Sequence, residues 1–366
     1  MFLAFREIRH ARLRFALITG VIVMVSSLVF ILSGLANGLA TGNSAAIDAL
    51  PIDGMLLSAG SDNQLDRSRL GTDVVDEVRG IDGIEDAQPF GATASNVTVD
   101  GSDDVIGVSI IGVNPDSFAA PSPNEGDPLG TEDNAVVIDR TLADEGVAIG
   151  DTLLSSPGEV ELVVVGIVED RSYRLAPTLF LPVELWQEVQ ADGSDQNADT
   201  INGVLVKGDG EAVDALPDSI DNTVVASKQE VVESLPGYSE QALTLLLIQV
   251  FLVVIAAGIV ASFFYIITLQ KIPELGVMKA LGTKTGYIAR NLITQVVVLG
   301  LVGVILGAVI AWAMAYAVGS AVPYTLDPGT IGLFSGILLV VAVLGTVLSL
   351  LQVAKIDPLD AINKAG

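Results

Sequence analysis

The strongest constraint on this chain is an uncharged apolar run from Ala242 to Leu269. About 20 apolar residues in a helix, at about 1.5 Å per residue, suffice to cross a bilayer. Three more uncharged runs of comparable length occur in the chain, and together they predict four transmembrane helices. The predicted helices cover residues 15–40, 240–269, 291–322 and 330–353.

Charge is confined to the other parts of the sequence. The chain is 51% hydrophobic yet carries a formal net charge of −26, which a single soluble domain rarely combines. Residues 41–239 hold 38 acidic against eight basic side chains. Strand-like runs such as Val105–Val113 and Glu161–Val168 recur there, with helical patterns at Leu70–Val78 and Pro182–Val189. The sequence therefore predicts a membrane α-helical protein with one α+β extracytoplasmic domain inserted between the first and second spans.

The acidity of residues 41–239 has two interpretations. In the first, the negative charge keeps an exposed domain soluble, including in a saline habitat. In the second, it repels anionic lipid headgroups and anionic solutes. Solubility is the simpler explanation, and the two interpretations predict the same fold.

Positive charges set the predicted orientation. Ten Lys and Arg residues flank the apolar runs on one side, and only four acids accompany them. By the positive-inside rule those flanks face the cytoplasm and the acidic domain lies outside. The ten are Arg6, Arg9, Arg12, Arg14, Lys271, Lys279, Lys284, Arg290, Lys355 and Lys364. We expect a multi-pass protein of the cell membrane with both termini in the cytoplasm.

The segments between the spans have predicted roles of their own. Residues 1–14 combine arginines with an apolar face, which is typical of an amphipathic helix at the membrane surface. A cleaved signal peptide is the competing interpretation, although the apolar run of residues 15–40 is long for one. The remaining segments are a cytoplasmic coupling segment (270–290), an external turn (323–329) and a cytoplasmic C-terminal tail (354–366).

Catalytic chemistry finds no support in the sequence. Cysteine is absent, His10 is the single histidine, and no carboxylates have metal-ligand spacing. Gly282-Thr283-Lys284-Thr285 lacks the spacing of a phosphate-binding loop. No basic and aromatic surface suggests nucleic acid binding. We predict no enzyme activity, no intrinsic cofactor and no metal in the protein alone.

The coupling segment contains a short predicted helix between the second and third spans. Pro273 suits the first turn of a helix, because its missing N–H is not needed there, and Gly282 suits the helix end. Such a helix either seals the turn or receives force from a cytoplasmic partner.

Two motifs identify a family resemblance. Pro273–Gly282 resembles the E-x-G-x-x-[RK]-A-[IL]-G segment of ABC transporter permeases of the FtsX/MacB type, and Lys355–Ile362 resembles their closing motif. The resemblance implies a homodimer in the lipid membrane, docked on a cytoplasmic dimer of ABC ATPase subunits that binds ATP and Mg. It also implies that the coupling residues are Pro273, Glu274, Gly276, Lys279, Leu281 and Gly282.

The first span carries a possible packing motif near its outer end. Gly34 and Gly38 form a G-x-x-x-G, which lets two helix backbones approach closely in lipid. We predict a contact with the second protomer there; the alternative is that the glycines simply mark the helix end.

The outer boundary of the second span is the predicted substrate site. Glu240 would be costly in lipid without a partner, so it lies at the headgroup level or faces a dimer cavity. Tyr238 is a typical interfacial aromatic residue.

Further short matches resemble the haem exporter branch of the family, which implies efflux of haem from the membrane. The matches are Leu13–Ile18, Phe30–Ala40, Ser172-Tyr173 ahead of Pro177, and Pro236–Tyr238. Ferric haem accepts a carboxylate or phenolate, so the candidate ligands, in order, are Glu240, Tyr238 and Tyr173. Arg174–Leu179 departs from the Ser-His-x-Pro-Val-Val expected there, which weakens the case for Tyr173.

Two kinds of function remain open from the sequence. In the first, a partner ATPase drives a pump for haem or another amphiphile such as a lipid, glycolipid or peptide. In the second, nothing is transported, and the same spans transmit force to the outer domain, which activates a cell-wall enzyme. The uncharged outer halves of the spans favour the pump.

Overall fold

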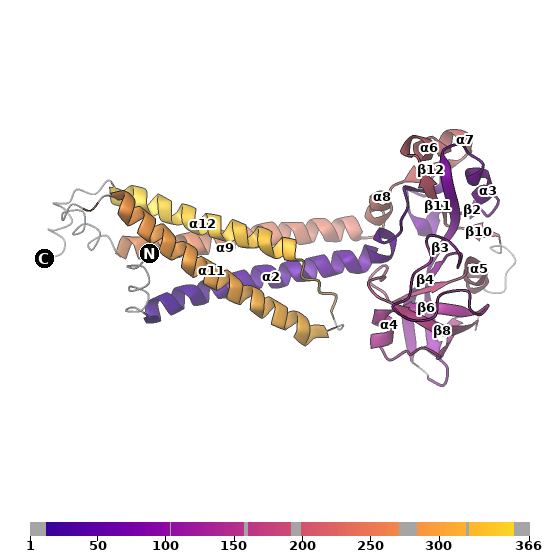
Figure 1. Ribbon diagram of the computed structural model, residues 1–366, viewed down its shortest axis with the longest axis horizontal. Coiled ribbons are helices and arrows are strands. Elements are labelled where there is room, and N and C mark those ends of the chain that lie inside the picture. The colour runs from indigo at the N-terminus through magenta and orange to yellow at the C-terminus, as the bar shows by residue number, and fades with distance from the viewer. Residues whose placement is uncertain are drawn as a thin grey trace. The chain divides into compact units, whose positions relative to one another are not determined.

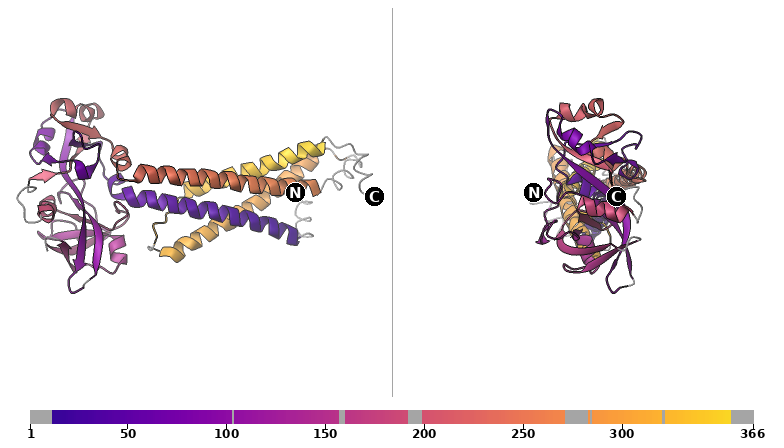
Figure 2. Two further views of the ribbon diagram at one scale, coloured as in Figure 1. Left: turned by 180° about the vertical axis from the view of Figure 1, so that it is seen from behind. Right: turned by 90° about the vertical axis from the view of Figure 1, so that its right-hand side faces the viewer.

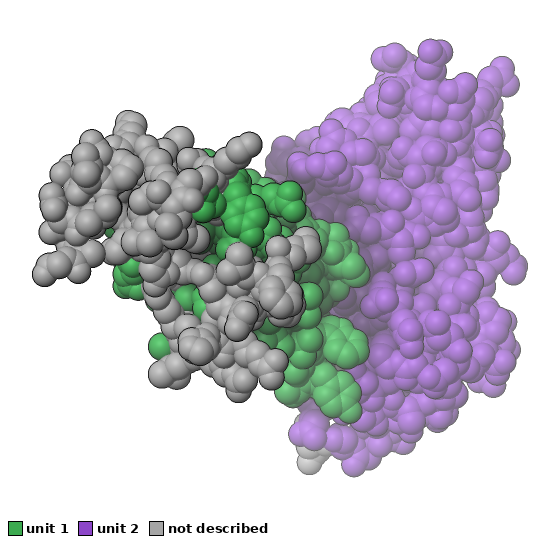
Figure 3. Space-filling model, turned by 60° about the vertical axis from the view of Figure 1, so that its left-hand side comes forward, with its two compact units in different colours: residues 1–38, 243–366 green, residues 39–242 purple. Residues whose placement is uncertain are grey.

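The computed structural model describes residues 12–102, 104–156, 160–191, 199–270, 283, 285–319 and 322–354. The chain divides into two compact units, shown in different colours in Figure 3. The helical unit consists of residues 1–38 and 243–366, and the outer unit consists of residues 39–242.

Within the residues that the structure describes, four helices are long and apolar enough to cross a membrane. They are α2 (Arg12–Asp48), α9 (Tyr238–Gln270), α11 (Thr285–Val318) and α12 (Pro328–Ala354), labelled in Figure 1. The prediction of four membrane helices is confirmed, together with a β-rich domain between the first and the second.

The helix bounds differ from the predicted spans at several ends. Helix α2 continues past Ala40 to Asp48, and α11 runs from Thr285 to Val318 where the predicted span covered residues 291–322. Hydropathy locates only the part of a helix that lipid can surround, whereas the helical backbone hydrogen bonds continue through polar residues. In α2, for example, the side chains of Asn43 and Ser44 donate to the carbonyls of Leu39 and Ala40, one turn back, at 2.9 and 3.2 Å.

Small residues allow close helix packing in the helical unit. A side chain at Gly303 would overlap Ile22, and one at Gly307 would overlap Ser26. The hydroxyl of Ser26 donates to the carbonyl oxygen of Gly303 at 3.3 Å. Close backbone approach and hydrogen bonds between helices are the means by which helices associate in lipid.

Six strands of the outer unit pair in a closed cycle. The cycle runs β3-β4-β9-β6-β8-β7 and returns to β3. Two of its pairings, β4 with β9 and β6 with β8, are parallel, and the others are antiparallel. The strands are β3 (Ile84–Val99), β4 (Val105–Gly112), β6 (Ala135–Asp139), β7 (Thr152–Ser156), β8 (Glu161–Val168) and β9 (Thr178–Leu181). Figure 2 shows the chain from behind and from the right-hand side of Figure 1.

Strand β3 also belongs to a second group of strands. Its first half pairs with β11 (Gly203–Gly208), and its second half pairs with β4 and β7. The order β12-β1-β11-β3 continues the sheet through β1 (Gly54–Ser58) and β12 (Thr223–Ala226). Strand β5 (Glu125–Gly126) pairs with β8, and β2 (Leu70–Gly71) pairs with β10 (Thr200–Ile201).

Short helices complete the outer unit. They are η1 (Leu65–Arg67), α3 (Val74–Arg79), α4 (Arg140–Asp144), α5 (Val183–Ala191), α6 (Gly210–Asp214), α7 (Leu216–Ser219) and α8 (Lys228–Glu233). The core of this unit consists mainly of buried Val, Ile and Leu side chains of the strands. The predicted strand Glu161–Val168 is confirmed at both ends as β8, and the predicted Val105–Val113 ends one residue earlier, at Gly112 in β4. The sequence analysis missed β1 and the first half of β3.

Candidate functional site

Tyr173, the third predicted ligand, is buried. Its side chain is 1% exposed, lies in a cluster with Ala46, Ile47 and Leu50, and its hydroxyl has no hydrogen-bond partner. Burial raises the pKa of the phenol above its ordinary value, with a smaller contribution from Asp66. In this conformation the phenol is therefore enclosed by protein side chains. Its role as a haem ligand stays a prediction.

The turn that contains Tyr173 explains its burial. Tyr173 and Ala176 form a bridge, and the intervening Arg174 and Leu175 both have positive φ, at 58° and 57°. The sequence gives no signal for this turn, because residues with a Cβ rarely adopt left-handed backbone and neither is Gly, Asn or Asp. The expected family motif is absent at this turn.

Tyr238 and Glu240 begin helix α9 and differ in environment. Tyr238 is half-buried and packs against the cluster that contains Tyr173. Glu240 is exposed, in the first turn of α9. Residues two apart on a helix point to different sides, so these two side chains do not converge on one ligand atom within one protomer. The structure brings the two tyrosines to one cluster and places the carboxylate elsewhere.

Gly34 and Gly38 have neighbours inside the chain. A side chain at Gly34 would lie 2.6 Å from the ring of Tyr324, and one at Gly38 would overlap the backbone of Pro323. The N–H of Thr325 donates to the carbonyl oxygen of Gly34 at 3.0 Å. The two glycines, which have no side chains, thus leave the space that the turn between α11 and α12 occupies. A contact with a second protomer at this face stays a prediction, and it would have to leave this turn in place.

The turn between α11 and α12 is held by its own hydrogen bonds. Tyr324 donates through its hydroxyl to the carbonyl oxygen of Ala311 at 3.3 Å. The Asp327 carboxylate accepts from the N–H and hydroxyl of Thr330 at 2.7 and 3.0 Å. These hydrogen bonds hold the pKa of Asp327 below its ordinary value. Asp327 is therefore an N-terminal cap of α12.

The predicted coupling residues cannot be placed. Pro273, Glu274, Gly276, Lys279, Leu281 and Gly282 lie outside the described residues, as does the closing motif at residues 355–362. Their role stays a prediction.

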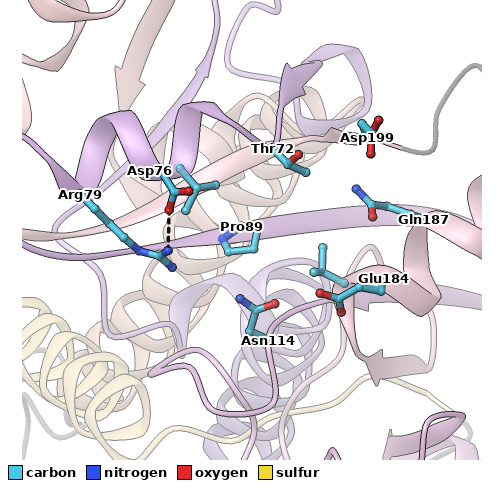
Figure 4. Close-up of a pocket in the computed structure, with 10 residues that line it drawn as sticks. Thr72, Asp76, Arg79, Pro89, Asn114, Glu184, Gln187 and Asp199 are labelled. Carbon is cyan, nitrogen blue, oxygen red and sulfur yellow. Dashed lines mark hydrogen bonds and ion pairs between the residues drawn. The ribbon is translucent and has the colours of Figure 1, made fainter.

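The outer unit contains a pocket of about 310 Å³ that the sequence did not indicate. It is lined by α3, α5 and β3, and Figure 4 shows Asp76 paired with Arg79 at one end and Glu184 and Gln187 at the other. The Asp76–Arg79 distance is 3.0 Å, and Arg79 Nε also donates to the carbonyl oxygen of Ala87. Among the described residues that line the pocket, the one cation, Arg79, is thus already paired. Among the described residues no group of His, Cys, Asp and Glu could hold a metal ion.

Asn202 is a buried polar residue whose role only the structure reveals. Its Oδ1 accepts from the N–H of Ala92 at 2.8 Å, and its Nδ2 donates to the carbonyl oxygens of Leu65 and Ser68. A fully satisfied buried amide fixes the position of neighbouring backbone segments. Asn202 is therefore structural, joining strand β3 to the η1 loop.

Known proteins resemble this chain over its whole length. Residues 246–358 match the family model for the FtsX-like permease C-terminal region. The resemblance to FtsX-type ABC transporter permeases is confirmed. Relatives named "Putative hemin transport system permease protein HrtB" are 26% identical in Staphylococcus haemolyticus and 25% identical in Staphylococcus epidermidis, each covering 99% of both chains.

The structural neighbours are more distant. The periplasmic region of MacB from Actinobacillus actinomycetemcomitans is 13% identical with a TM-score of 0.37, covering 50% of this chain and 91% of that one. That likeness is too weak to carry fold or function. The chain is therefore similar to ABC transporter permeases, and its described residues include four helices that are long and apolar enough to cross a membrane.

Proposed function

We propose that this protein is the permease subunit of an ATP-driven efflux pump that exports haem from the membrane. The observation that carries the proposal is the alignment with HrtB proteins across 99% of both chains, which includes the outer unit as well as the spans. A separate ABC ATPase dimer binds ATP and Mg and drives the cycle, and two copies of this chain form the membrane part.

The charge distribution supports the proposed orientation of the chain in the membrane. Ten basic residues flank the spans on one side, and residues 41–239 carry a large acidic excess on the other. The positive-inside rule then puts the outer unit outside the cell and residues 270–290 next to the ATPase. The proposed substrate enters from the membrane near the outer ends of the spans, where Glu240 begins α9.

Glu240 and Tyr238 are the proposed haem contacts. Glu240 is exposed, so a haem iron can reach its carboxylate, and Tyr238, two residues earlier, is half-buried. Because the two side chains point to different sides of α9, we propose that Glu240 supplies the oxygen ligand and Tyr238 packs against the porphyrin edge or its own cluster.

Hemin binding tests this proposal directly. We expect the purified protein to bind hemin with a shifted Soret band, and Glu240→Ala to change that band and weaken binding about tenfold or more, because an anionic oxygen ligand is lost. Glu233→Ala removes another exposed acid of the same unit and is the matched control. An unchanged spectrum in Glu240→Ala removes Glu240 as the ligand. No hemin binding by the native protein moves the substrate to another amphiphile.

Coupling to the ATPase has a separate test. We expect Glu274→Lys to leave the protein folded but to abolish substrate-stimulated ATP hydrolysis in the reconstituted complex, because the reversed charge no longer fits the partner. Lys284→Glu, a charge reversal in the same loop outside the motif, is the control, and we expect it to retain more activity. Normal transport by Glu274→Lys contradicts the assigned coupling role.

A further inference from the structure

The pocket of the outer unit presents carboxylates that the protein itself leaves unpaired. Three carboxylates line it, those of Asp76, Glu184 and Asp199. Asp76 is paired with Arg79 at 3.0 Å. Within the described part of the chain, the side chains of Glu184 and Asp199 have no ion-pair or hydrogen-bond partner. Two negative charges at the pocket are therefore available to a ligand.

A chain of hydrogen bonds fixes the orientation of one amide at the pocket. Gln88 Nε2 donates to both carboxylate oxygens of Asp86 at 3.1 Å. Asn114 Nδ2 in turn donates to Gln88 Oε1 at 3.1 Å. An ionised carboxylate can only accept, so Asp86 sets the direction of both amides. The Oδ1 of Asn114 is left as an unused acceptor at the wall of the pocket, as far as the described residues go.

A second amide is fixed in the same way. Gln187 Nε2 donates to the carbonyl oxygen of Thr200 at 3.2 Å, which leaves Gln187 Oε1 as an acceptor. Figure 4 shows the oxygen of Asn114 turned toward the carboxylate of Glu184. Two acceptors that face each other repel unless a donor lies between them. This set of oxygens therefore fits a ligand that supplies N–H donors and positive charge.

The rest of the pocket wall includes apolar side chains. Val75 of α3 and Val183 of α5 are buried, and Pro89 of β3 is half-buried. Apolar surface of this kind packs against methylene groups whose charged end stays with polar partners. The volume of about 310 Å³ lies at the small end of the range for ligand pockets. The pocket thus suits a small molecule with a short alkyl chain and a cationic end.

Two simpler explanations account for only part of this arrangement. Glu184 lies in the first turn of α5, where a negative charge interacts favourably with the helix dipole, but that interaction needs no amide acceptors. The acidic excess of residues 41–239 attracts all cations, but it needs no oriented oxygens. Among the described residues no group of His, Cys, Asp and Glu could hold a metal ion. An organic cation accounts for the carboxylates, the amides and the apolar wall together.

We propose that this pocket binds a small organic cation, a primary ammonium or guanidinium on a short alkyl chain. Its N–H groups donate to the carboxylates of Glu184 and Asp199 and to the fixed amide oxygen of Asn114. Its methylene groups pack against the apolar side chains of the wall. The inference does not depend on haem export, because every residue that lines the pocket belongs to the outer unit.

Calorimetric titration of the purified full-length chain in detergent tests the ligand class. The probes are agmatine and putrescine, at a salt concentration of about 0.15 M that suppresses diffuse attraction. We expect saturable binding of both, with a Kd below about 1 mM. Tetramethylammonium carries a positive charge without N–H donors, and we expect it to bind about tenfold more weakly or not at all.

Paired variants test the site. Glu184→Gln with Asp199→Asn removes both unpaired carboxylates, and we expect the Kd of agmatine to rise about tenfold or more. Glu77→Gln with Glu188→Gln is the matched control. It removes the same charge from exposed residues of α3 and α5 that do not line the pocket. We expect this control to bind agmatine as the native chain does. Glu184→Gln alone, with an expected rise of about threefold, decides the matter if the first pair does not fold.

Three results would overturn the proposal. The first is the absence of saturable binding of agmatine and putrescine to the native chain. The second is equal weakening in the two variant pairs, which would mean that only the overall charge of the unit attracts the probes. The third is binding of tetramethylammonium as tight as that of agmatine. Binding of an arginine-containing peptide, with neither amine bound, would also overturn it and would make the occupant a basic segment of a protein partner.

Discussion

The helical unit and the outer unit arrange apolar side chains in opposite ways. In α9, Phe251 is 64% exposed and Val254 61%, whereas Phe90 and Phe180 of the outer unit are at most 2% exposed. Many exposed apolar side chains on one helix are stable when lipid or a second copy of the chain covers them. A buried apolar core under an acidic surface is stable in water. The difference shows that the helical unit is adapted to lipid and the outer unit to water.

The two units nevertheless use the same device for close packing, with different neighbours. In the helical unit, Gly34 and Gly38 seat the turn at Pro323–Tyr324, and at Gly38 the neighbour is backbone. In the outer unit, Gly91 and Gly112 seat the side chain of Trp186 from α5. Backbone can yield only by moving a whole segment, whereas a side chain can adopt another rotamer. The first site is therefore expected to be the less tolerant one.

The largest effect is expected at Gly38. Gly38→Leu places a side chain where the Pro323 backbone lies, so the turn between α11 and α12 must separate from α2. We expect the variant to lose the folded helical unit, measured as loss of the monodisperse protein in detergent. Gly20→Leu, at a glycine of α2 with open space around it, is the control. A well-folded Gly38→Leu would show that the close contact between α2 and the turn is not needed for folding.

An intermediate effect is expected at Gly112. Gly112→Val brings a side chain against Trp186, whose Cβ would lie 2.6 Å from the new Cβ. Overpacking of this kind costs about 1–3 kcal/mol, so we expect a lower unfolding temperature with the fold retained. Gly107→Val, on the same strand with only Asn96 nearby, is the control. An equal loss at both glycines would mean that strand propensity and not Trp186 sets the effect.

The smallest effect is expected at the cap of α8. Ser227 and Glu230 form a capping box, and Ser227→Ala removes one half of it at a cost of about 1 kcal/mol. The hydrogen bonds from Ser227 hold the pKa of Glu230 below its ordinary value of 4.5. That contribution is present at neutral pH and is lost as the pH falls through the lowered pKa. Thermal unfolding of both proteins at pH 7 and near pH 3 should show the difference shrinking in acid.

Some of this structure could be predicted because it depends on short-range patterns. Uncharged runs predict spans, since lipid cannot solvate charge, and runs of Val and Ile predict strands such as β8. The closed strand cycle could not be predicted, because it depends on pairings between segments far apart in the chain. Strand β1 was missed because its short run, Gly54–Ser58, has no flanking alternation.

The candidate site divides in the same way. Glu240 was predicted from its place beside an apolar run, and it lies exposed in the first turn of α9. Tyr173 was chosen from a short local match, yet its environment is set by Ala46 and Leu50, more than a hundred residues earlier in the chain. No local pattern contains that information.

By itself the sequence determined that this chain has four membrane helices, an acidic domain between the first two, and motifs that resemble those of ABC permeases. It could do so because solvation of charge and local backbone preferences act on neighbouring residues. Only the tertiary structure decided that Gly34 and Gly38 pack against a turn of their own chain and that the turn at residues 172–176 hydrogen-bonds to the end of α2. Those contacts arise when distant segments bury their backbone polar groups against each other, and burial of that kind is a property of the folded chain as a whole.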